Sequence, residues 1–279
     1  MRQLRNAAAK LLLWLSAGAV SVLLFGLAGY VCFRGIPGLS WQFLTGEESI
    51  LKGTTGILPA VLNTLAVIAV SLAVVVPLGV GAAVYLTEYA KNRLLVSCVE
   101  FAAEVLSGIP SILYAMIGAF VFCDRLGLQK TLLAGALTLA IMTLPTVLRT
   151  TQESLKATPA SYREGALGLG SGKWPMIRTV VLPASLDGIL TGCVLAAGRV
   201  AGETAVLMYT AGLSTAMQDF SSLPSALHAS GATLPVALYV YAKERADFAA
   251  AFAAATVLLG IAAGINLLAA VIGRRARRG

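Results

Sequence analysis

Six apolar stretches, each long enough to cross a lipid bilayer, constrain this chain more than any other feature of its sequence. A hydrocarbon core about 30 Å thick requires about 20 consecutive apolar residues in a helix. The stretches are Leu11–Phe33, Ile57–Leu86, Val105–Cys123, Thr131–Leu148, Leu186–Thr210 and Phe248–Ile272. Because lipid cannot satisfy backbone polar groups, each stretch is expected to be a helix. We therefore predict an all-α integral membrane protein with six transmembrane helices.

The composition supports this fold class and excludes others. Of the 279 residues, 58% are hydrophobic and 12% are charged, whereas a soluble domain carries about 25% charge. The net charge of +8 lies between the apolar stretches, so we expect no nucleic-acid partner. Four cysteines without CxxC spacing and a single histidine predict no metal site. Without a repeat or linker, residues 1–279 are expected to form one transmembrane domain.

The positions of Lys and Arg predict the orientation in the membrane. With the N-terminus inside, 14 basic residues fall in inside segments and 6 fall in outside segments. Because basic residues are concentrated in cytoplasmic loops, both termini are expected in the cytoplasm. The longest inside segment is then residues 150–185, and Ala211–Asp247 lies outside.

Two charged residues lie within the fifth apolar stretch. Arg199 and Glu203 are four residues apart and therefore share one face of a helix. A charge in mid-membrane costs about 2.5–3.5 kcal/mol on insertion scales, so such residues usually face a bundle interior or a wet pathway. We expect Arg199 and Glu203, with the Thr204 hydroxyl beside them, to line a translocation path for an anion. The alternative is a structural ion pair that holds helices together.

The long inside segment carries a second pattern. Ser161 with Glu164 three residues later matches a capping box, and Trp174 with Pro175 can begin another helix. Two short helices suit docking into a groove on a partner, and a plain solvated loop is the alternative. The run Gly168–Lys173 is similar to a phosphate-binding loop but lacks Gly at position 167 and Ser or Thr at position 174. No nucleotide site is expected in this chain.

This segment resembles the EAA motif of ABC importer permeases, EAA-x3-G-x9-I-x-LP. Every spacing is kept, and the matching residues are Glu164, Gly165, Ala166, Gly170, Val180, Leu182 and Pro183. Gly165 replaces Ala and Val180 replaces Ile. The resemblance implies a MetI-like ABC importer permease fold, in which these seven residues form the element that couples to an ATPase.

Other stretches resemble one branch of that class, the phosphate-importer permeases of the PstA type. They are Leu39–Thr45, Gly56–Ala60, Leu78–Tyr89, Ser107–Ser111, Gly198–Thr204 and, more weakly, Leu234–Tyr239. Asn63 stands where the resemblance leads us to expect Gly, and the outer segment before the last span diverges.

The resemblance implies a permease subunit of an ATP-driven importer of inorganic phosphate, in a bacterial plasma (inner) membrane. Its expected partners are a sister permease in a heterodimer, two cytoplasmic ATPase subunits and an extracytoplasmic phosphate-binding protein. ATP and Mg would be held by the ATPase subunits, so this chain is expected to bind no cofactor and to have no catalytic residue. The alternatives are a permease for another oxyanion (sulfate, molybdate or phosphonate), a stand-alone secondary transporter or channel, and a phosphate-signalling scaffold.

Overall fold

The computed structural model describes residues 2–48, 55–220 and 222–276, and the regular structure in this part of the chain is helical. Four helices are long and apolar enough to cross a membrane: Lys10–Gly38, Leu58–Tyr89, Leu132–Ala157 and Phe248–Arg274. Two bent pairs bring the total to six: Arg93–Gly108 with Ser111–Arg125, and Lys173–Ala184 with Leu186–Ala201. The predicted all-α, six-span architecture is confirmed.

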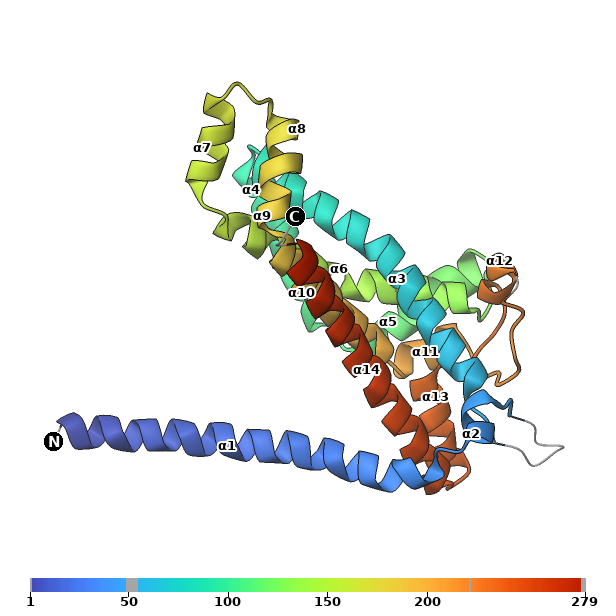
Figure 1. Cartoon of the computed structure of the whole chain (residues 1–279). Helices are drawn as coiled ribbons and strands as arrows, with labels where there is room; N and C mark the ends of the chain where they lie inside the picture. Colours follow the sequence, from blue (N-terminus) through green and yellow to red (C-terminus); the bar gives the residue numbers. More distant parts are fainter. Residues whose placement is uncertain (1, 49–54, 221, 277–279) are drawn as a thin grey trace.

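The helices follow one another in the order shown by colour in Figure 1. They are α1 (Arg2–Gly35), α2 (Trp41–Thr45), α3 (Leu58–Val84), α4 (Arg93–Gly108), α5 (Ser111–Gly118), α6 (Leu132–Ala157), α7 (Ala160–Gly168), α8 (Lys173–Met176), α9 (Leu182–Ala184), α10 (Leu186–Ala201), α11 (Ala205–Thr210), α12 (Leu223–Leu227), α13 (Leu234–Tyr239) and α14 (Phe248–Ala276). A 3-10 turn, η1 (Ile36–Gly38), follows α1. Single π-helical segments extend four helices: η2 (Tyr85–Tyr89) after α3, η3 (Ala119–Arg125) after α5, η4 (Ile177–Val181) after α8 and η5 (Val240–Glu244) after α13.

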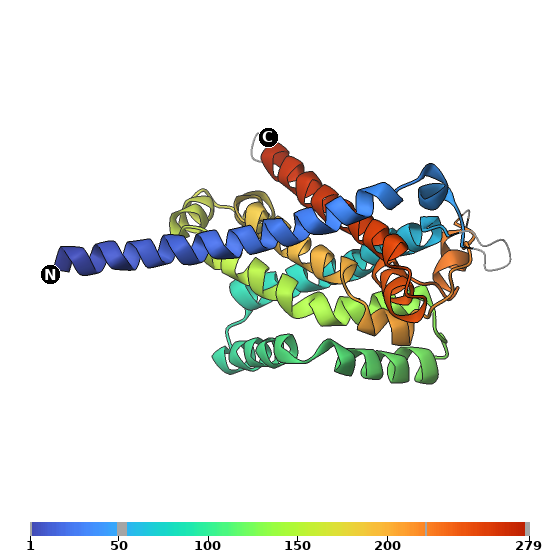
Figure 2. The same ribbon diagram turned by 90° about the horizontal axis from the view of Figure 1, so that it is seen from below.

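Helix α6 lies at the centre of the bundle and is buried along most of its length, because α3, α10 and α4 pack around it. The hairpin of α7 and α8 projects from one end of the bundle, whereas α2, α12 and α13 lie at the other end (Figures 1 and 2). The C-terminal end of α14 packs against the start of α10, on the hairpin side (Figure 1). Which side faces the cytoplasm stays a prediction.

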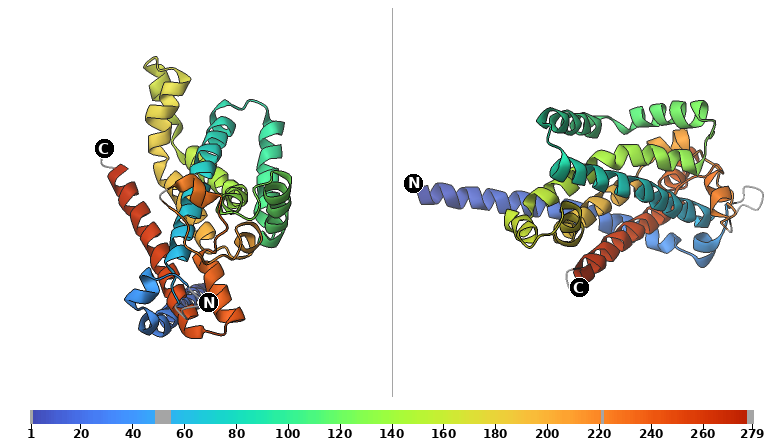
Figure 3. Two further views of the ribbon diagram at one scale, coloured as in Figure 1. Left: turned by 90° about the vertical axis from the view of Figure 1, so that its right-hand side faces the viewer. Right: turned by 90° about the horizontal axis from the view of Figure 1, so that it is seen from above.

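The first span, α1, packs against α14 near its own C-terminal end and otherwise projects away from the bundle (Figures 2 and 3). The Thr256 hydroxyl donates to the Val31 carbonyl at 3.3 Å, and the Arg34 guanidinium lies 5.6 Å from the centre of the Phe252 ring. These contacts fix the angle between the first and last spans.

Two of the expected spans are not continuous helices, which corrects the sequence prediction. The span expected at Val105–Cys123 breaks at Gly108–Pro110, and its two parts meet at 101°. Pro110 lacks an N–H and forces the preceding residue into extended backbone (φ −70°, ψ 131°). The span expected at Leu186–Thr210 breaks at Gly202–Thr204, where two of the three residues are poor helix formers.

The segment Ala211–Asp247, which precedes the last span, is bound to the second span by hydrogen bonds. The Asn63 side-chain amide donates to the Ala232 carbonyl at 3.0 Å, and the Leu234 N–H donates to the Thr64 hydroxyl at 2.8 Å. Asn63 is the position where the resemblance predicts Gly, so its amide supplies a contact that glycine cannot. The segment is therefore a packed cap on this end of the bundle.

Candidate functional site

The EAA-like segment folds as a helical hairpin that reverses at Gly170. Gly170 has φ +82°, a left-handed conformation that favours glycine. The Ser171 N–H donates to the Ala166 carbonyl at 3.1 Å, and the Gly170 N–H donates to the Leu167 carbonyl at 2.9 Å. This pair of bonds is a Schellman motif, in which the glycine terminates α7. A tight bend is therefore present at Gly170.

The start of α7 differs from the prediction. Pro159 occupies the N-cap position without a side-chain cap, and Ser161 lies inside the first turn. The predicted capping box of Ser161 and Glu164 is therefore wrong. The reason is Pro159, which disfavours helical backbone at the preceding residue, so that α6 ends at Ala157 and α7 starts directly after the proline.

The motif residues divide into an exposed set and a set packed under the hairpin. The exposed residues are Glu164, Gly165, Gly170 and Pro183, and the partly buried ones are Ala166, Val180 and Leu182. A Cβ atom added to Gly165 would meet no atom within 4 Å, so packing does not require glycine there. The hairpin also exposes large apolar side chains, Tyr162, Leu167, Leu169 and Trp174, at 50–91% of their surface. Apolar patches of this kind typically mark protein contacts.

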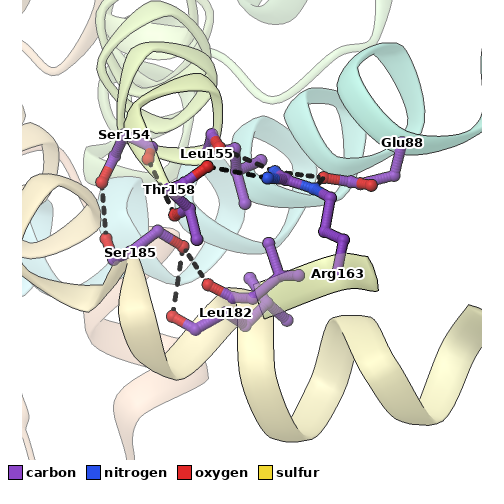
Figure 4. Close-up of polar contacts among 8 residues, drawn as sticks. Glu88, Ser154, Leu155, Thr158, Arg163, Leu182 and Ser185 are labelled. Carbon is purple, nitrogen blue, oxygen red and sulfur yellow. Dashed lines mark hydrogen bonds and ion pairs between the residues drawn. The ribbon is translucent and has the colours of Figure 1, made fainter. Parts of the chain in front are cut away.

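A partly buried polar contact beneath the hairpin centres on Arg163 and could not be seen in the sequence (Figure 4). The Arg163 Nε and Nη2 atoms donate to Glu88 Oε1 at 3.0 and 2.7 Å. The Arg163 Nη1 atom donates to the Thr158 carbonyl and Nη2 to the Leu155 carbonyl, both at 2.8 Å. The only sequence signal was Glu88 itself, a carboxylate at the end of an apolar span.

The second arm of the hairpin is fastened to α6 by hydroxyl groups, also visible in Figure 4. The Ser154 hydroxyl donates to the Ser185 carbonyl at 2.9 Å, and the Ser185 hydroxyl donates to the Val181 carbonyl at 2.7 Å. Ser185 is buried at the 67° bend that joins the hairpin to α10. The start of the fifth span is therefore hydrogen-bonded to the fourth span.

Arg199 and Glu203 flank the break in the fifth span. Arg199 lies in the last turn of α10, and Glu203 lies in the break before α11. The Glu203 carboxylate accepts the Val206 N–H at 3.3 Å and so caps the first turn of α11. Within the described ranges four ion pairs form, and Arg199 takes part in none of them. The structural ion pair considered as the alternative is therefore not formed in this structure.

The helices that follow the breaks in the third and fifth spans, α5 and α11, pack against each other. Pro110 cannot donate to the Leu106 carbonyl four residues earlier, and the Tyr114 hydroxyl donates to this carbonyl at 2.8 Å instead. Arg199 is partly exposed in the last turn of α10, next to the break in the fifth span.

One face of α10 opens onto a groove of about 530 Å³ between α10 and α14. Its polar lining residues are Asp187, Thr191, Asn266 and Arg274. Gly198 and Gly202 continue the exposed face of α10 toward Arg199. As for metals, no group of three or more His, Cys, Asp or Glu in the described part of the chain is arranged to hold an ion.

The architecture is that of a membrane transport protein, a bundle of membrane-length helices with a helical hairpin between the fourth and fifth spans. The chain belongs to the family described as "Binding-protein-dependent transport system inner membrane component", whose model matches residues 75–278. It is accordingly a non-catalytic, multi-pass component of the inner membrane.

Several relatives are phosphate permeases. The chain is 32% identical to the phosphate transport system permease protein PstA 1 of Mycobacterium tuberculosis (strain CDC 1551 / Oshkosh) over 97% of its length and 89% of that protein. It is 34% identical to PstA of Pasteurella multocida (86% and 84% covered). It is also 35% identical to a probable ABC transporter permease, YqgI, of Bacillus subtilis (74% and 70% covered).

Solved structures confirm the fold. A bacterial importer of alginate matches with a TM-score of 0.64, covers 99% of both chains and is 16% identical. The inward-facing MetNI methionine transporter matches with a TM-score of 0.64, covering 79% of this chain and 95% of that one at 18% identity. At these identities the matches support the MetI-like fold and not the substrate.

Proposed function

We propose that this chain is the permease subunit of an ATP-driven importer of inorganic phosphate. The observation that carries the proposal is the likeness to a phosphate permease along 97% of the chain. The likeness covers the hairpin and both broken spans.

The site supports an anionic substrate. Arg199 presents a partly exposed guanidinium without an ion-pair partner among the described residues, next to a helix break. Guanidinium groups bind phosphate oxygens through two parallel hydrogen bonds. Arg199, Glu203 and Thr204 are proposed to line the path, with Glu203 limiting how tightly the anion is held. Selectivity would then rest mainly with a separate binding protein.

The hairpin supports the proposal that a separate ATPase subunit drives transport. Its exposed apolar residues and the motif residues Glu164, Gly165, Ala166, Gly170, Val180, Leu182 and Pro183 are proposed to dock a cytoplasmic ATPase subunit. The complete importer would contain a sister permease, two such ATPases, which bind ATP and Mg, and an extracytoplasmic phosphate-binding protein.

Reconstitution tests the substrate. The complex of this chain with its sister permease, ATPase subunits and binding protein is reconstituted into proteoliposomes, and uptake of radiolabelled phosphate is measured. Uptake should require ATP and the binding protein, and excess sulfate, molybdate or phosphonate should not compete. A complex whose ATPases cannot hydrolyse ATP is the control. Competition by another oxyanion, or uptake without ATP, would contradict the proposal.

The orientation makes a separate prediction. Ser222 is exposed in the outer segment, and Ser171 lies in the hairpin turn. In a cysteine-free background, Ser222→Cys should react with a membrane-impermeant maleimide in intact cells. Ser171→Cys should react only after permeabilisation. The reverse pattern would show that the hairpin is outside.

A further inference from the structure

We propose that the ion pair of Arg163 and Glu88 is the positioning contact through which the hairpin moves the end of the second span. The inference rests on the proposed function, because it takes the hairpin to be the ATPase-docking element. It assigns a role in coupling to two residues outside the helix break and outside the exposed docking face.

The geometry of Arg163 favours a rigid link. All three nitrogens of its guanidinium donate, and together they make four hydrogen bonds to η2 and to the end of α6. The carbonyls of Leu155 and Thr158 lie at the C-terminal end of α6, where helical carbonyls lack partners and favour a cation. One side chain of α7 therefore ties the hairpin to the ends of two spans at once.

The Arg163–Glu88 pair is less exposed to solvent than the Lys156–Glu100 pair. The Glu88 side chain is 7% exposed and that of Arg163 is 21% exposed. At the same end of the molecule, the Lys156–Glu100 pair has side chains that are 56% and 35% exposed. Exposed pairs contribute little because water screens them, whereas loss of one partner from a shielded pair leaves a charge that is poorly solvated. The Lys156–Glu100 pair is therefore a matched control.

The second arm of the hairpin also contacts the π-helical segment η2. The Lys173 ammonium lies 4.9 Å from the centre of the Tyr89 ring, next to Glu88. Beneath these contacts, Met176, Ile177 and Val181 of the hairpin pack in one apolar cluster with Val84 and Leu86 of the second span. Both arms thus hold η2, and the hairpin cannot shift without displacing it or breaking these contacts.

Movement of η2 has a direct route to the proposed path. Helix α3 continues into η2 and packs along both α6 and α10. Helix α10 carries Arg199 in its last turn. A shift of the hairpin is therefore transmitted through packed helices to the helix break, without passing through the bend at Ser185.

The test uses the complete reconstituted importer and measures phosphate taken up per ATP hydrolysed. The variants are Glu88→Gln, which removes the charge, and Arg163→Lys, which keeps the charge but loses the forked hydrogen bonds. We expect each to lower this ratio roughly threefold to thirtyfold, with ATPase subunits still bound and ATP still hydrolysed. Glu100→Gln and Lys156→Arg should leave the ratio unchanged.

A purely structural role predicts a different result. Such a role would reduce the amount of assembled complex, or it would lower the rates of phosphate uptake and ATP hydrolysis in proportion. In either case the phosphate taken up per ATP hydrolysed would stay the same. An unchanged ratio in both variants, or failure of both to assemble, would overturn the proposal, because the pair would then be only a folding element. Absence of phosphate uptake by the wild-type complex would instead count against the proposed function.

Discussion

Replacement of Gly170 by valine should uncouple ATP hydrolysis from uptake while the chain still inserts into the membrane. Gly170 has φ +82°, and a Cβ atom there would meet no atom within 4 Å. The effect is therefore one of backbone strain and not of a steric clash with a neighbour. Holding a β-branched residue in this conformation costs about 1–3 kcal/mol, so the hairpin turn should open.

If the hairpin docks the ATPase, a strain of that size should lower uptake per ATP hydrolysed about fivefold or more. The measurement is the same ratio in proteoliposomes, with ATPase binding followed by co-purification. Gly168→Val is the matched control, because it lies within α7 with equally open space around it and without a positive φ. Gly170→Asn should retain most coupling, since Asn tolerates left-handed backbone. Normal uptake by Gly170→Val would refute the role of the turn.

The sequence predicted the spans well because their length and hydropathy follow from the thickness of a bilayer. It missed the breaks in the third and fifth spans because apolar residues resume directly after each break, so that the overall hydropathy of each stretch is that of one span. Proline alone does not predict a break, since Pro77 and Pro145 lie within the continuous helices α3 and α6. At Pro110 the break is stabilised by a side chain on its far side, because the Tyr114 hydroxyl donates to the Leu106 carbonyl. Such a contact is invisible to hydropathy.

In the candidate sites, too, local features were predictable from the sequence and contacts between distant residues were not. The turn at Gly170 was predictable, because a spaced motif marks it and its conformation is local. The Arg163–Glu88 pair was not, because its residues are 75 positions apart and meet only when the hairpin folds back on the second span. The N-cap of α7 was mispredicted because the constraint of Pro159 on the backbone outweighs the preference of Ser161 for a capping position. Local chemistry is readable from sequence, whereas partners across the bundle are not.

The substitution Arg199→Lys should impair phosphate uptake although it keeps the positive charge. A lysine ammonium cannot reproduce the forked hydrogen bonds of a guanidinium to phosphate oxygens. Hydrogen bonds to charged groups contribute about 1.5–3 kcal/mol, so loss of one at the rate-limiting point would lower uptake about tenfold to a hundredfold. The control is Arg149→Lys on α6. Arg149 forms an exposed ion pair with Glu104 of α4, and this variant should transport normally.

Glu203→Gln separates charge from helix capping at the same site. The glutamine carbonyl can still accept the Val206 N–H, so α11 should keep its first turn and the chain should remain folded. Removal of the carboxylate leaves Arg199 without nearby negative charge, so the anion should be held longer and uptake should slow. A path that binds its substrate tightly cannot release it. The measurement is initial uptake over a range of phosphate concentrations, in which a lower maximal rate at a lower half-saturating concentration is expected.

If Arg199→Lys and Glu203→Gln both insert, assemble and transport at wild-type rates, the two residues only stabilise the helix break, and the placement of the path on the fifth span is wrong.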